Sequence, residues 1–221
     1  MKILLIAGHG ESDSGAVANG YIEAELTREV VRKLKPQLDR YADATIADTG
    51  KNWFTYKNRV SLNFALYDYV LEIHFNAAVN DTKGNGRTTG TEIYITTSEK
   101  THGVETEIVK GLSVIGFANR GVKRKNFSVI ARAKNQGVSS ALLEVCFIDD
   151  LDDMLLYQSK KDSVIKAIAN GIIKGFGLKE KEPDYVSIIK EKIGLEDSTI
   201  EYLQNYKYGA ELIRKIANAV K

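Results

Sequence analysis

Two histidines lie where apolar runs give way to loops. The run from Ile3 to Ala7 reads as a buried strand and ends in GHG, with His9 at its centre, and His74 lies near the end of the run in LEIHFNAA. Glu144 lies inside a further apolar run, ALLEVCF. Two imidazoles and a carboxylate at one edge of a sheet form a ligand set of catalytic zinc sites, which keep a fourth position for water. A second carboxylate nearby can accept the proton of that water. These residue types therefore predict a hydrolytic metal site.

The third ligand of such a site is not fixed by spacing alone. Glu23 and Glu25 both lie at the start of a predicted helix, in NGYIEAELTREVV, and either could join the histidines. Both also fit a structural role, since acidic residues in a first turn interact favourably with the helix dipole. A lone histidine at a strand end is commonly only hydrogen-bonded. Glu144 is harder to explain in this way, because a buried carboxylate must be paired, coordinated or protonated.

Alternating apolar runs and amphipathic segments through residue 178 predict the elements that must position these side chains. The expected strands are Ile3–Ala7, Ala44–Ala47, Val70–Phe75, Thr91–Thr96, Phe127–Arg132 and Ala141–Phe147. The expected helices cover 26–38, with Pro36 near its end, 53–68, 101–117 and 161–176. This order predicts an α/β fold, a twisted and mostly parallel sheet with helices on both faces. Ligands of such sheets bind beyond the carboxyl ends of the strands, where both histidines fall.

The composition changes after residue 178, where the stretch KEKEPD is charged and poor in apolar residues. Residues 179–184 are therefore predicted to be a linker between a main domain at 1–178 and a small helical domain at 185–221.

Three short helices are expected in this last domain. They cover about 185–193, 199–207 and 209–220. Gly194 fits a helix stop, and Ser198 with Glu201 fits a capping box that opens the next helix. A segment of this size is small for independent stability, so we expect it to pack on the main domain, on a second copy of itself or on a partner.

Composition excludes several classes of function. The 221 residues carry 31 Lys and Arg against 29 Asp and Glu, with no basic block, so no nucleic-acid partner is expected. The apolar runs are too short to span a bilayer, and the amino terminus lacks the apolar core and cleavage site of a secretory signal. We therefore expect synthesis in the cytoplasm without a membrane anchor. Cys146 is the single cysteine, which excludes an intramolecular disulfide and a cysteine-rich zinc knuckle.

Five motifs resemble one known family, the zinc-dependent N-acetylmuramoyl-L-alanine amidases of the type-3 class, found as bacterial autolysins and phage endolysins. GHGESDSGAVANGYIEAELT is similar to the family's opening, a GHG followed by Asp-x-Gly-Ala and a Gly-x-x-Glu that enters a helix. EIHFNAA resembles its Ile-His-x-Asn segment, and GTEIYI the strand after it. NRGVKRKNFSVIARAK resembles an Arg-Gly-Val-Lys stretch with its aromatic strand, and ALLEVCFIDD the closing Glu-Val-x-Phe segment. The motifs follow in order over residues 1 to about 177.

The resemblance implies a role for each candidate residue. His9, Glu23 and His74 fall on the family's zinc ligands, and Glu144 falls on its catalytic glutamate. Glu25 becomes the second choice as a ligand. Residues 1–178 are then a zinc amidase catalytic domain.

Other residues near these motifs have weaker assignments. Glu72 shares a strand face with the second histidine and could support it, although a surface or ion-pair role is favoured. His102 has no counterpart in the family and is expected in solvent, and Cys146 is expected to be a packing residue. The chain departs from the family at Glu11 and Ser14, where a second glycine and a proline are frequent.

The implied activity is hydrolysis of the amide between N-acetylmuramic acid and L-alanine of the peptidoglycan stem peptide, which causes bacterial cell lysis. Zinc would activate the attacking water, and Glu144 would take its proton and pass it to the leaving amine. Two alternatives stay open, a zinc peptidase that cuts within the stem peptide and a non-catalytic wall-binding protein. A phosphate loop of a nucleotide-binding domain is disfavoured, because GHGESDSG lacks the full G-x-G-x-x-G pattern.

Peptidoglycan is the expected partner, and the C-terminal helices have two interpretations. They bind the wall by stacking tyrosines on sugars, or they pair two copies of the chain in a homodimer. The tyrosines are Tyr202, Tyr206 and Tyr208. A lytic enzyme made without an export signal is expected to reach the wall after release, as a phage lysin or as a lysis enzyme of a sporulating mother cell.

Overall fold

The computed structural model describes residues 1–100 and 103–220. The chain forms two compact units, Met1–Glu180 and Lys181–Lys221, and each has its own apolar core. Among the described residues, no helix is both long and apolar enough to cross a bilayer.

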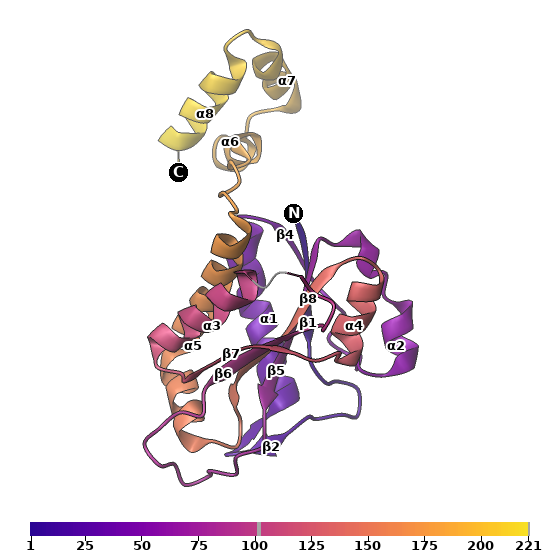
Figure 1. The fold of residues 1–221 in the computed structure, drawn as a ribbon. Coiled ribbons are helices and arrows are strands. Elements are labelled where there is room, and N and C mark those ends of the chain that lie inside the picture. Colours follow the sequence, from indigo (N-terminus) through magenta and orange to yellow (C-terminus); the bar gives the residue numbers. More distant parts are fainter. Residues whose placement is uncertain (101–102, 221) are drawn as a thin grey trace. The chain divides into compact units, whose positions relative to one another are not determined.

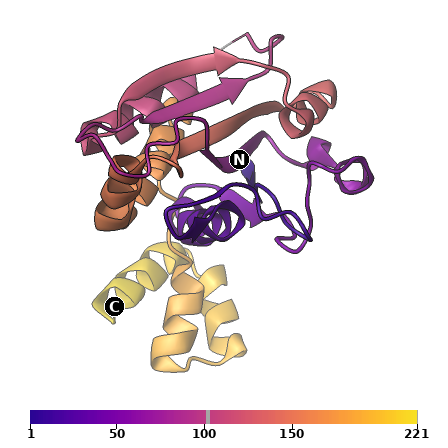
Figure 2. The same ribbon diagram turned by 90° about the horizontal axis from the view of Figure 1, so that it is seen from below.

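A six-stranded sheet forms the centre of the first unit. Its strands are β1 (Lys2–Ala7), β4 (Asp43–Ile46), β5 (Tyr69–Asn76), β6 (Thr91–Ile95), β7 (Asn119–Arg124) and β8 (Ser139–Phe147). They lie in the order β4-β1-β5-β8-β6-β7, and every neighbouring pair is parallel except β6 and β8. Figure 2 shows β6 and β7 side by side at one edge. A separate two-stranded hairpin consists of β2 (Val17–Ala18) and β3 (Tyr21–Ile22). The predicted α/β fold with a mostly parallel sheet is confirmed.

Helices cover both faces of this sheet, because side chains alternate along each buried strand. Ile3 and Leu5 point to one face, which packs against α1, α3 and α5. Leu4 and Ile6 point to the other face, into a smaller core completed by α4 and by the segment around α2. Figure 1 shows α1, α3 and α5 on one side of the sheet and α2 and α4 on the other. These helices are α1 (Glu23–Asp39), α2 (Tyr56–Ser61), α3 (Gly103–Ile115), α4 (Ser128–Asn135) and α5 (Leu151–Phe176).

The strand predicted at Phe127–Arg132 is wrong, because this segment opens α4. Its β-branched run suggests a strand, but Val129, Ile130 and Ala133 recur at helical spacing and are all buried on one face of the helix. The strand of this region is β7, in NRGVKR, which no apolar alternation marks. It is polar because it lies at the edge of the sheet, where most of its side chains stay in contact with solvent.

Two helices differ in extent from their predictions. The helix expected at 53–68 is limited to α2 and a 3-10 turn at Phe64–Leu66. Helix α5 begins at Leu151 rather than at 161, since Asp150 caps it by accepting a hydrogen bond from Asp153 N at 3.1 Å. A kink at Lys160, with φ −123° and ψ 20°, separates this early part from the stretch that the periodicity marks.

The second unit contains the three short helices that the sequence predicts. They are α6 (Tyr185–Ile193), α7 (Asp197–Asn205) and α8 (Gly209–Ala219), packed around Ile189, Ile200, Ile213 and Ala217. Gly194 ends α6 in the left-handed conformation, with φ +74°, as expected. The capping box at Ser198 is wrong, because Glu196 is the N-cap residue and α7 begins before Ser198.

Candidate metal centre and active site

His9 occupies a strained backbone position at the carboxyl end of β1. Its φ of +65° lies in the left-handed region, which residues other than glycine rarely adopt. The preceding Gly8 N–H donates to Ile73 O on β5 at 2.9 Å, so the loop leaves the sheet beside that strand. His9 Nδ1 lies 2.9 Å from Asp13 Oδ2, and Nε2 lies 3.0 Å from Glu23 Oε2. Backbone strain of this kind is characteristic of functional sites.

Glu23, the first residue of α1, stands between the two histidines. Its Oε2 faces His9 Nε2, and its Oε1 lies 3.0 Å from His74 Nδ1. The carboxylate also accepts backbone N–H groups from Ala16 at 2.9 Å and from Phe75 at 3.0 Å. These two donors come from the loop before α1 and from β5, so they fix the orientation of a buried carboxylate that belongs to a helix.

The three side chains form a cluster that fits a metal ion. One ligand atom from each of His9, Glu23 and His74 lies within 4.8 Å of the others. Two imidazole nitrogens and one carboxylate oxygen are a donor set of catalytic zinc, with a fourth position for water. Each histidine also directs its other nitrogen at a carboxylate, His9 at Asp13 and His74 Nε2 at Glu72 Oε1, 3.3 Å away. Metal-binding histidines characteristically have such outer partners, which fix the tautomer and the ring orientation.

Asp13 and Asn52, which orient the His9 ring, were not predicted from the sequence. Asp13 accepts hydrogen bonds from Asn52 Nδ2 and from Gly15 N, both at 2.9 Å, so its carboxylate is held at the histidine. Its place four residues after His9 in one loop is a usable signal, whereas nothing in the sequence marks Asn52.

Four further expectations can be compared with the structure. Glu72 is 4% exposed and faces His74, so a surface role for it is wrong. Glu25 points to solvent, so Glu23 is the glutamate that the structure brings to the histidines. Cys146 is fully buried in the larger core, as expected for a packing residue, and burial raises the pKa of its thiol. His102 lies outside the described residues.

Glu144 lies on β8 directly opposite His74 on β5. Its Oε2 is buried and has no hydrogen-bond partner in the described part of the chain. Burial raises the pKa of this carboxyl to about 7; the charge of His74 opposes the shift, and the nearby Glu23, Glu92 and Glu72 add to it. A carboxyl with a pKa near neutrality can both accept and return a proton.

Hydrogen bonding sets the charge of the cluster. Burial alone favours the neutral form of both histidines, but their bonds with Glu23 reverse this and raise the pKa of each. Burial likewise favours protonated Glu23, and the hydrogen bonds from His74 and His9 outweigh it and lower the pKa of that carboxyl. Glu23 is therefore ionised at neutral pH, while the Glu144 carboxyl has a pKa close to that pH.

A cavity of about 410 Å³ opens over these residues. All four predicted site residues line it, together with Phe54, Phe127 and Leu142. The cavity lies on the face of the sheet that α2 and α4 cover, beyond their edge and at the carboxyl ends of β1 and β5. A substrate in this cavity would contact the ligand cluster and Glu144 together.

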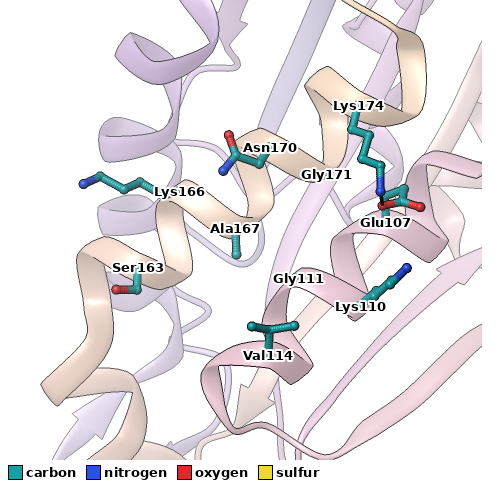
Figure 3. A pocket seen from close by; sticks show the side chains of 10 residues that line it. All are labelled: Glu107, Lys110, Gly111, Val114, Ser163, Lys166, Ala167, Asn170, Gly171 and Lys174. Carbon is teal, nitrogen blue, oxygen red and sulfur yellow. Dashed lines mark hydrogen bonds and ion pairs between the residues drawn. The ribbon is translucent and has the colours of Figure 1, made fainter.

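A second hollow, of about 440 Å³, lies on the opposite side of the sheet between α3 and α5 (Figure 3). Small residues form its floor, where Gly111 packs against Ala167, and charged side chains such as Lys110 and Lys166 also line it. Lys174 is paired with Glu107 at 2.6 Å. None of the residues that line it is a histidine or a cysteine, so it offers no comparable reactive site.

Comparisons with known proteins agree with this geometry. Residues 3–174 match the family model described as N-acetylmuramoyl-L-alanine amidase. The endolysin of Bacillus phage SPP1 is 29% identical over 180 residues, which cover 78% of this chain and 64% of the endolysin. The N-acetylmuramoyl-L-alanine amidase CwlM of Bacillus licheniformis is 31% identical over 190 residues, which cover 80% of this chain and 70% of CwlM.

One solved structure shows the same fold. The catalytic domain of CwlV, an N-acetylmuramoyl-L-alanine amidase from Bacillus (Paenibacillus) polymyxa var. colistinus, superposes with a TM-score of 0.66 at 24% sequence identity. The match covers 81% of this chain and 100% of that one.

The fold and the matches define a peptidoglycan amidase domain over residues 3–174. The chain belongs to the N-acetylmuramoyl-L-alanine amidase family. The resemblance inferred from the five sequence motifs is thereby confirmed. The chain spans slightly less than two thirds of the SPP1 endolysin.

Proposed function

We propose that this protein is a zinc-dependent hydrolase that cleaves the amide between the lactyl group of N-acetylmuramic acid and L-alanine of the stem peptide, and so lyses bacterial cells. In this proposal His9, Glu23 and His74 hold the ion and Glu144 is the general base and acid. The observation that carries it is the Glu144 carboxyl, whose buried Oε2 has no hydrogen-bond partner among the described residues and which shares one cavity with a His₂Glu cluster.

The chemistry follows from these positions. A bound Zn²⁺ supplies polarisation of the scissile carbonyl and acidity to a coordinated water. Glu144 accepts the proton of the water as its oxygen bonds to the carbonyl carbon, and returns that proton to the nitrogen as the carbon–nitrogen bond breaks. The products are a glycan strand with a free lactyl carboxylate and a peptide with a free amino terminus at alanine. Asp13 and Glu72 keep the two imidazoles in place throughout.

Two other functions compete with this one. A zinc peptidase that cuts within the stem peptide would use the same residues, and the family match favours the muramoyl amide. A non-catalytic wall-binding protein has no need of a carboxyl with a buried, unpartnered oxygen beside such a cluster, since burying such an atom is unfavourable.

We further propose that the second unit is a wall-binding or dimerisation domain, reached through the linker at 179–184. Three of its tyrosines are exposed and could stack on sugars or on a second copy of the chain: Tyr202, Tyr206 and Tyr208. The protein then acts at the cell wall, as the names of its relatives suggest.

The test combines metal content with product analysis for the parent, Glu144→Ala and Glu25→Ala. Glu25 lies on the same helix as Glu23 but points to solvent, so its variant is the matched control. We expect about one zinc per chain in all three, as in a three-ligand site, and lysis of purified walls with new amino-terminal alanine in the parent and the control alone. Absence of zinc from the parent, or lysis by Glu144→Ala, contradicts the proposal.

A further inference from the structure

The side-chain cluster of His9, Glu23 and His74 lies on the same face of the sheet as two positively charged side chains, Arg120 and Lys123. Along one row across the strands, His74 on β5 faces Glu144 on β8, which faces Glu92 on β6. The next row on the same face runs from β5 to β7 and contains Glu72, Leu142, Tyr94 and Lys123, in that order. Three strand spacings of about 4.8 Å separate β5 from β7, so the backbones of these two strands lie about 14 Å apart.

Glu92 organises these cations. It is only 1% exposed, and its Oε2 accepts Arg120 Nε at 2.5 Å and Lys123 Nζ. Its Oε1 accepts Tyr94 Oη at 2.6 Å and Asn76 Nδ2 at 3.0 Å. Two positive side chains therefore meet one buried carboxylate, which leaves one positive charge in excess within the group of Arg120, Lys123 and Glu92.

Arg120 is held in a geometry that suits a carboxylate ligand. Its Nε is occupied by Glu92, and its guanidinium lies over the Phe147 ring with 4.9 Å to the centroid. The two terminal nitrogens have no acceptor within the described residues, and the side chain is 38% exposed. Those nitrogens form the planar fork that binds a carboxylate through two parallel hydrogen bonds.

One of the two parts of the proposed substrate carries free carboxylates. The glycan contributes neutral N-acetyl sugars, whereas the stem peptide carries free carboxylates. An extended peptide advances about 3.3–3.6 Å per residue, so about four residues after the scissile amide span about 14 Å. Fewer residues are needed because the long Arg120 side chain bridges part of this distance.

The side of the cavity next to β1 differs in charge from the edge of the sheet that carries Arg120 and Lys123. Next to β1 lie the carboxylates of Glu11 and Asp13, with the exposed Phe54 at the cavity wall. Acidic groups repel a peptide carboxylate, while an exposed aromatic ring suits a neutral sugar.

We propose that Arg120 and Lys123, held by Glu92, form a subsite that binds a free carboxylate of the stem peptide, so that the peptide crosses β8 and β6 toward β7 and the glycan lies toward Phe54. This inference rests on the proposed amidase function and adds a substrate orientation and a specificity to it.

The experiment uses the full zinc-loaded chain and soluble muramoyl peptides in which the free carboxylate of the second residue or of the carboxyl terminus is replaced singly by a carboxamide. The parent should hydrolyse one of these amides at least about 10-fold less efficiently than the acid, since charge-assisted bidentate bonds contribute about 10- to 100-fold. In Arg120→Gln that ratio of kcat/KM should fall to about 1, mainly through a higher KM for the acid. Arg120→Lys keeps the charge without the fork and should give an intermediate ratio. Lys110→Gln, an exposed site on α3, is the control for net charge.

The outcomes separate the two proposals. If the parent hydrolyses none of these substrates, the proposed amidase function fails. If the parent cleaves acids and amides equally well, or if its preference persists in Arg120→Gln, the carboxylate subsite is overturned while the amidase function stands. Because Lys123, Tyr94 and Asn76 still satisfy Glu92 in the Arg120 variants, we expect them to fold, and zinc content close to that of the parent verifies this.

Discussion

His74 and Glu144 are paired residues of the neighbouring parallel strands β5 and β8, so the imidazole and the carboxyl stand side by side on one face of the sheet. Their separation is therefore set by the strand ladder and not by loop conformation. The same ladder places Glu144 beside Glu92, and burial, with a smaller contribution from this and other nearby carboxylates, raises the pKa of Glu144 to about 7. In the proposed reaction, a proton acceptor fixed in this way would need no rearrangement before it acts.

Replacing this carboxyl should separate activity from stability. Glu144→Gln removes the proton acceptor and should lower kcat about 10²- to 10⁴-fold. The same change removes a carboxylate that burial disfavours. Because the pKa of Glu144 is raised in the folded state, its ionisation destabilises the parent as pH rises from the ordinary pKa of a glutamate toward 7. The variant should therefore be at least as stable as the parent at pH 8, which urea unfolding at that pH measures. A variant that is inactive but clearly less stable would instead indicate a structural role.

The pH dependence of the parent should show the same group. Glu144 must be ionised to accept a proton, so kcat/KM should rise with pH along an acid limb with an apparent pKa at or below about 7. A cation bound nearby favours the carboxylate and moves that limb to lower pH. Rates on a soluble muramoyl peptide between pH 4 and 9 measure it. A limb centred well above 7 contradicts this assignment.

The proximity of His9 and His74 was predictable because of the topology. His9 and His74 end parallel neighbouring strands, so their meeting follows from two apolar runs and the α/β alternation. Glu144 was found because a carboxyl inside ALLEVCF contradicts its surroundings. Asn52 was not found, because a long loop whose path no local pattern encodes brings it to Asp13.

The edge of the sheet was less predictable for a related reason. Local sequence patterns indicate which residues are buried, and few side chains of β7 are buried. Helix α4, in contrast, buries β-branched residues that also suit a strand. The proposed carboxylate subsite, with Arg120 and Lys123, thus lies on the strand that was not predicted from the sequence.

The two outer carboxylates should tune metal affinity. Asp13→Asn and Glu72→Gln weaken the contacts that orient His9 and His74, and the zinc dissociation constant should rise about 10- to 100-fold in each. Competition with a chromophoric chelator measures it, with the exposed Glu201→Gln in the second unit as control. Unchanged affinity in both variants means that these contacts do not support the metal site.

Gly8 should be required for the site although it contributes no ligand. A Cβ at this position would lie 2.4 Å from His74 Cε1, so Gly8→Ala must displace the imidazole. Zinc affinity should fall about 10-fold or more, as for loss of a group that orients a ligand. Gly103→Ala, whose Cβ would meet nothing within 4 Å, is the matched control. Equal zinc binding by the two variants counts against His74 as a ligand.

Asp153 should control the stability of the loop that joins β5 to β6. This fully buried carboxyl accepts the N–H groups of Phe147 at 2.8 Å and of Gly90 at 3.0 Å. Asp153→Ala leaves both donors without a partner and should cost about 2–6 kcal/mol of unfolding free energy, at about 1–3 kcal/mol for each buried donor. Asp153→Asn keeps an acceptor oxygen and should cost less.

Its pH dependence distinguishes this role from simple packing. Burial raises the pKa of Asp153 from 3.8 to about 7, so between these values the folded protein binds more protons than the unfolded chain. The contribution of this group to stability is therefore complete below pH 3.8 and is lost as pH rises through 7. The parent should lose more stability than Asp153→Asn between pH 5 and pH 8, as urea unfolding at the two pH values measures. Parallel pH profiles for the two proteins show that Asp153 is already ionised in the folded state, and then its hydrogen bonds, rather than burial, determine its charge.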